Sequence, residues 1–198
     1  DAVKNFTVGE GGGFTTKNAA EYTRAKQLRY CGIGKSGFDS AHENKSDIWW
    51  EYNISEPFIK MLPTNLHAAI GLGQLKKIDR LQARRQEIWN YYQENLVTVP
   101  DIKLPSDAPD HSTHSFFTYA IRVPRRNELA KYLLENGVYT TLRYHPLHLN
   151  PIYKQTGVAL LNSEELNKTA LSIPIHPRLT NSDLETVIGL IKKFYGSC

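Results

Sequence analysis

The stretch DAVKNFTVGEGGG, residues 1–13, places Lys4 five residues ahead of a run of glycines. A lysine amine can act as a nucleophile or hold a carbonyl cofactor covalently when its neutral form is available. Apolar neighbours such as Val3 and Phe6 favour that form because they exclude water. Glycines let the backbone approach a flat ring or a phosphate without a Cβ in the way. These residues favour Lys4 as a catalytic amine, with a solvated loop lysine as the alternative.

Composition excludes several classes of protein. The 198 residues carry a formal net charge of +4, and basic side chains are spread among acidic ones, so no nucleic-acid partner is expected. No run of about 18 apolar residues exists, so no membrane partner is expected. Cys31 and Cys198 are too few for a disulfide framework, which favours a cytoplasmic location. His145 and His148 lack a supporting cysteine or carboxylate cluster, so no metal is predicted.

The beginning of the chain also bears on its organisation. It starts at Asp1, without an initiator methionine or a signal peptide, and no helix or strand is predicted ahead of Lys4. We therefore expect a piece of a larger polypeptide.

Hydrophobic periodicity and capping residues predict a mixed α/β chain. Helices are predicted over residues 18–29, from 64, over 78–96, 127–136 and 164–170, and after 180. Strands are predicted over residues 12–16, 115–123, 138–143 and 171–175, and a long loop over 32–51. The proline-rich segment 97–113 marks a boundary between two regions.

Four stretches in the same order and spacing resemble the DegT/DnrJ/EryC1/StrS family of pyridoxal-phosphate-dependent sugar aminotransferases. They are VKNFTVGEGG (3–12), EPFIKMLPTNLHAAIGLGQL (56–75), YHPLHLNPIY (144–153) and LSIPIHPRLT (171–180). The resemblance implies the C-terminal half of a fold-type-I enzyme. Residues 1–98 would be the end of the large cofactor-binding domain with linking helices, and residues 99–198 the small C-terminal α/β domain.

The resemblance also implies a reaction and roles for individual residues. Lys4 would hold pyridoxal 5'-phosphate and move the proton during transamination. The amino group would pass from an amino-acid donor, glutamate, to a nucleotide-linked keto-sugar used in polysaccharide biosynthesis. Lys60 would reach the cofactor phosphate of the neighbouring subunit in a homodimer, although the sequence around it departs from the family's pattern. Tyr144 and His148 would border the substrate.

Several alternatives stay open at this point. Lys60 also fits a solvated surface lysine, and His148 a packing role. The cofactor-contacting residues that precede the lysine in the family are not in this chain, so a missing N-terminal half is an expected partner. A non-catalytic binding or regulatory protein on the same half-fold is one rival. A related sugar dehydratase is another, and Lys4 argues against it because such enzymes typically lack the lysine.

Overall fold

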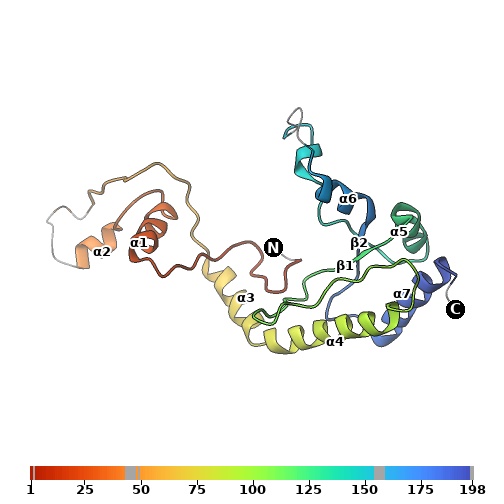
Figure 1. Cartoon of the computed structure of the whole chain (residues 1–198). Helices are drawn as coiled ribbons and strands as arrows, with labels where there is room; N and C mark the ends of the chain where they lie inside the picture. Colours follow the sequence, from red (N-terminus) through yellow and green to blue (C-terminus); the bar gives the residue numbers. More distant parts are fainter. Residues whose placement is uncertain (2, 43–47, 49, 154–158, 197–198) are drawn as a thin grey trace. The chain divides into compact units, whose positions relative to one another are not determined.

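The computed structural model describes residues 1, 3–42, 48, 50–153 and 159–196 (Figure 1). The chain forms two compact units, Asp1–Lys76 and Lys77–Cys198, called here the N-terminal and C-terminal units. The domain boundary that we predict at residue 98 concerns the whole enzyme and stays a prediction.

Capped helices dominate the described part of the N-terminal unit. They are α1 (Ala19–Leu28), α2 (Gly37–His42) and α3 (Asn65–Leu75). The side chain of Asn18 caps α1 and that of Thr64 caps α3, each by accepting backbone N–H groups of the first turn. The strand predicted over 12–16 is wrong, because the segment is extended but pairs with no strand among the described residues. The predicted loop over 32–51 contains α2, and part of it lies outside the described residues.

The turn after α1 pairs with the extended segment before α3. Antiparallel bridges join Tyr30 to Lys60 and Ile33 to Ile54. Gly32 has a φ of +75°, and a Cβ built on it would lie 2.0 Å from the backbone oxygen of Glu56. Only glycine fits there, because both the backbone conformation and the close approach exclude a side chain.

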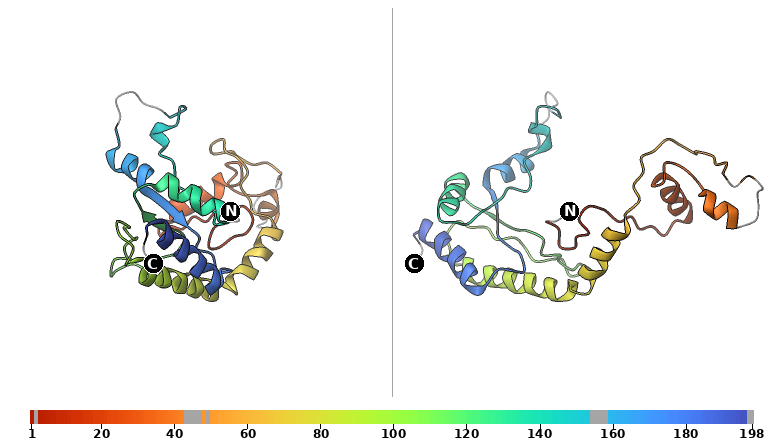
Figure 2. Two further views of the ribbon diagram at one scale, coloured as in Figure 1. Left: turned by 90° about the vertical axis from the view of Figure 1, so that its right-hand side faces the viewer. Right: turned by 180° about the vertical axis from the view of Figure 1, so that it is seen from behind.

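A short antiparallel sheet lies at the centre of the C-terminal unit. Strands β1 (Tyr119–Arg122) and β2 (Ala170–Ile173) pair in the register Tyr119↔Ile173. Thr141 adds a single bridge to β2, so the strand predicted over 138–143 is reduced to this one contact. The helical elements of the unit are α4 (Ile78–Leu96), α5 (Arg126–Glu135), the 3-10 turn η1 (Leu147–Leu149), α6 (Leu161–Thr169) and α7 (Asn181–Phe194). Helices α4 and α7 lie side by side (Figure 2).

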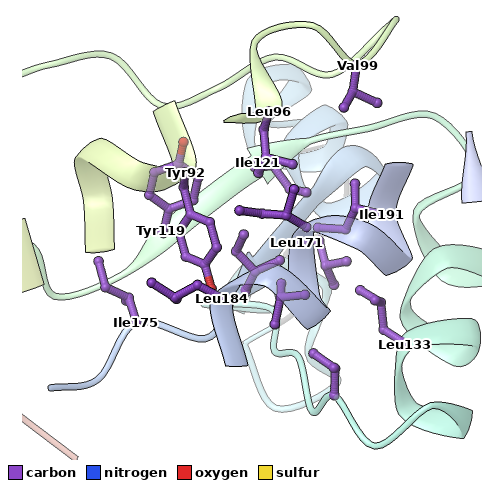
Figure 3. Packing of buried hydrophobic residues seen from close by; sticks show 14 of the residues in the cluster. Tyr92, Leu96, Val99, Tyr119, Ile121, Leu133, Leu171, Ile175, Leu184 and Ile191 are labelled. Carbon is purple, nitrogen blue, oxygen red and sulfur yellow. The ribbon is translucent and has the colours of Figure 1, made fainter. Parts of the chain in front are cut away.

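The hydrophobic core belongs to the C-terminal unit. It joins the apolar face of α4 to both strands and to α5 and α7 (Figure 3). Its largest fully buried side chains are Trp89, Tyr92 and Tyr119. Among the described residues of the N-terminal unit, only Gly32 and Gly71 are buried. The C-terminal unit therefore has a core of its own, whereas α3 exposes large apolar side chains such as Leu66 and Leu72.

Polar side chains of α4 hold the segment 171–180 that precedes α7. Arg85 is 8% exposed and donates to the carbonyl oxygen of Ile175 at 2.7 Å. The hydroxyl of Tyr92 donates to the carbonyl oxygen of Pro174 at 2.9 Å. These bonds satisfy backbone oxygens at the end of β2 and fix the approach to α7.

Candidate functional site

Lys4 lies in a turn at the start of the N-terminal unit. Its backbone N–H donates to the carbonyl oxygen of Asp1 at 3.3 Å, and its Nζ lies 3.7 Å from Asp1 Oδ2. The Lys4 side chain is 44% exposed. An exposed ion pair of this kind contributes only about 0–1 kcal/mol, so it restrains the amine weakly. The Lys4 side chain is therefore partly exposed to solvent.

The loop that carries Lys4 packs on α3. A Cβ built on Gly71 would lie 3.0 Å from Val8 Cγ1 and 3.7 Å from Phe6 Cζ. Gly9 has a φ of +94°, and a Cβ built on it would lie 3.6 Å from Cδ2 of His67. The missing side chain of Gly71 lets the loop and the helix approach closely, whereas Gly9 supplies the positive φ that other residues rarely adopt. This anchoring was missed at the sequence level, although both glycines lie in the stretches that carry the family resemblance.

Lys60 lies in the same unit, on the segment that pairs with the turn after α1. Its side chain is exposed, and its Nζ is 5.8 Å from the centre of the Tyr30 ring. An exposed amine on a paired segment is suited to act as a point charge toward an anion. Its role toward the cofactor phosphate stays a prediction.

Tyr144 and His148 lie in the C-terminal unit, on the loop that leads into η1. The Tyr144 side chain is 68% exposed, and the Arg143 guanidinium is 6.0 Å from the centre of its ring. His148 is within η1, and its side chain is 11% exposed. Both residues stay predicted substrate neighbours, and they share a unit with each other but not with Lys4.

The structure adds Glu164 to this part of the candidate site. His148 Nε2 lies 3.1 Å from Glu164 Oε1, which also accepts the backbone N–H of Leu160 at 3.1 Å. These hydrogen bonds, that of His148 first, lower the pKa of Glu164 below its ordinary value. Glu164 lies 16 residues after His148 on α6, and no short-range pattern in the sequence connects the two.

Residues 1–192 match the DegT/DnrJ/EryC1/StrS aminotransferase family. The chain belongs to this family. Its enzymes depend on pyridoxal phosphate, and their fold is the α/β fold that the sequence motifs predict.

Curated and solved relatives agree with this assignment. The chain is 34% identical to a dTDP-4-dehydro-2,3,6-trideoxy-D-glucose 4-aminotransferase of Saccharopolyspora spinosa, over 98% of the chain and 50% of that protein. It is 31% identical to the spore coat polysaccharide biosynthesis protein SpsC of Bacillus subtilis, over 96% of the chain and 51% of that protein. The crystal structure of the aminotransferase TlmJ from Streptoalloteichus hindustanus matches with a TM-score of 0.77 and 31% identity, over 89% of the chain and 45% of TlmJ. The chain therefore spans about half the length of the relatives that it matches.

The residues around Lys4 fit the family's cofactor. The reactive group of pyridoxal phosphate is an aldehyde, and the primary amine of Lys4 is its chemical complement. Cβ atoms built on Gly12 and Gly13, in the same stretch of sequence, would meet nothing within 4 Å, so the backbone at these two glycines is open.

Two further kinds of site were sought. Within the described ranges, no group of three or more histidine, cysteine, aspartate or glutamate side chains could hold a metal ion. In the same part of the chain, no helix combines the length and the apolar character that crossing a membrane requires.

Proposed function

We propose that this chain supplies the lysine-bearing half of a cytoplasmic, homodimeric aminotransferase that converts a nucleotide-linked keto-sugar into an amino-sugar. Glutamate is the proposed amino donor, and polysaccharide biosynthesis the proposed use of the product. The names of two relatives support the substrate and its use, since one acts on a dTDP-linked keto-sugar and the other serves a spore coat polysaccharide. The chain spans about half of each of these relatives. We therefore assign the rest of the cofactor pocket to the expected N-terminal half, called here the completing polypeptide.

One observation carries the proposal. Lys4 carries a primary amine on a side chain that is 44% exposed, on a loop that packs closely on Gly71 of α3. A fixed loop matters because a displacement of about 1 Å at a reacting group can reduce a rate 100-fold. The amine would hold the cofactor, and its Nζ would then carry the proton that leaves the α-carbon of the donor. When bound, pyridoxal phosphate supplies the electron sink for that proton transfer.

The other predicted residues take supporting roles. Lys60 places a positive charge for the phosphate of the cofactor, which in a homodimer belongs to the neighbouring subunit. Tyr144 and His148 offer hydrogen-bonding groups on the substrate side. Of these groups, Lys60 and Tyr144 are exposed, whereas His148 is only 11% exposed.

The first experiment tests the cofactor lysine. The chain is produced together with its completing polypeptide, and the pair is called here the completed enzyme. The completed enzyme is incubated with pyridoxal phosphate and then reduced with borohydride. Peptide mass spectrometry should find the pyridoxyl group on Lys4, and Lys4→Arg should abolish it. Lys17→Arg is the matched control, because Lys17 is another exposed lysine near the start of the chain. Equal labelling of Lys4 and Lys17 would refute the assignment.

The second experiment tests the reaction. The completed enzyme receives glutamate and a dTDP-linked 4-keto-sugar, and the formation of 2-oxoglutarate and an amino-sugar is followed by mass spectrometry. We expect both products in equal amounts. Loss of water from the sugar without amino transfer would favour the dehydratase reading. No conversion, together with retained sugar binding, would favour a binding protein.

A further inference from the structure

The pairing between His148 and Glu164 joins two elements of the C-terminal unit. His148 belongs to η1 and Glu164 to the first turn of α6. Their side chains are 11% and 30% exposed, and His148 Nε2 is 3.1 Å from Glu164 Oε1. A partly shielded carboxylate at hydrogen-bonding distance restrains an imidazole more firmly than solvent does.

We propose that Glu164 is a positioning residue that holds the His148 ring for contact with the sugar substrate. A carboxylate accepts hydrogen bonds only, so the proton of the His148–Glu164 bond belongs to Nε2. Nδ1 is then the ring nitrogen left to contact an oxygen atom of the substrate. This inference rests on the proposed function, because only that function brings a sugar to His148.

The surroundings of Glu164 keep its carboxylate charged and in place. The backbone N–H of Leu160 donates to the same oxygen at 3.1 Å, which ties the side chain to the start of α6. Lys168, one turn further along α6, is the other charged group that acts on the carboxylate, and it also favours the ionised form. The start of α6 therefore restrains the Glu164 side chain independently of its contact with His148.

Nuclear magnetic resonance tests the pairing without any catalysis. Carbon-13 spectra of the glutamate carboxyl groups should show that His148→Leu, which has no hydrogen-bond donor, raises the pKa of Glu164 toward its ordinary value, because the largest cause of its lowering is lost. His145→Leu, at an exposed histidine on the same loop, should leave that titration unchanged. An identical Glu164 titration in wild type and His148→Leu would overturn the proposal.

Kinetics of the completed enzyme test the consequence. Glu164→Ala, which removes the acceptor, should lower kcat by about 10-fold to 100-fold, the scale expected when a group near the reaction is misplaced by about 1 Å. Glu164→Asp should recover part of the loss, and Glu165→Ala, at the next and exposed position of α6, should have no effect. Borohydride labelling of Lys4 should stay at the wild-type level in Glu164→Ala.

The outcomes separate this inference from the proposed function. An unchanged kcat in Glu164→Ala would refute the positioning role alone. A wild-type enzyme that transfers no amino group would refute the proposed function and the positioning role with it. In that case the carboxyl titration would still decide whether the two side chains are paired.

Discussion

Replacing Gly71 by alanine should displace the loop that carries Lys4 while α3 stays folded. The new Cβ would lie 3.0 Å from Val8 Cγ1, whereas the optimal distance between non-bonded carbon atoms is about 3.5–4.0 Å. Val8 must therefore retreat by a few tenths of an ångström, and it is only four residues from Lys4. Alanine also stabilises a helix interior by about 0.5–1 kcal/mol relative to glycine, so α3 itself should not be lost.

The assay is the rate at which pyridoxal phosphate becomes attached to Lys4 in the completed enzyme. Gly71→Ala should lower this rate by about 3-fold to 10-fold, because about 1 Å at a reacting group costs up to about 100-fold and the shift here is a fraction of that. Gly73→Ala is the matched control, since a Cβ built on Gly73 of the same helix would meet nothing within 4 Å. Circular dichroism should show equal helix content in both variants. Equal labelling rates in Gly71→Ala and Gly73→Ala would refute the claim that α3 positions the Lys4 loop.

Three further predictions concern stability. Ile88→Ala, at a fully buried core position, should lower the free energy of unfolding of the C-terminal unit by about 2–5 kcal/mol in urea titrations, whereas Leu134→Ala at a 59% exposed position should change it by less than about 0.5 kcal/mol. Gly32→Ala should speed hydrogen exchange of the backbone amides that pair the turn after α1 with the segment before α3, and unchanged exchange would contradict the close approach. The Thr180 hydroxyl and backbone N–H donate hydrogen bonds to Asp183, and these bonds lower the pKa of its carboxyl group. The ionised carboxylate therefore adds to the free energy of unfolding above the ordinary carboxyl pKa of about 4, and this contribution is lost as the pH falls below that value. Asp183→Asn should therefore make the urea midpoint of unfolding fall less steeply as the pH is lowered. An unchanged dependence of the midpoint on pH would contradict the pairing of Asp183 with Thr180.

Local signals in the sequence were sufficient for most helices. The helix predicted over 78–96 is α4 with the same bounds, and the helix predicted after residue 180 is α7, which Thr180 caps. Capping and helical periodicity act over a few residues, so they can be read along the chain. The strand predicted over 12–16 failed because a strand needs a partner, and partners are set by distant residues.

The sequence by itself determined the family and the candidate residues Lys4, Lys60, Tyr144 and His148, since the motifs that carry them are contiguous. Only the tertiary structure decided what holds these residues. The contact of Gly71 with Val8 and the pairing of Glu164 with His148 join segments that are far apart along the chain. Such contacts depend on how elements pack, and no spacing in the sequence specifies them.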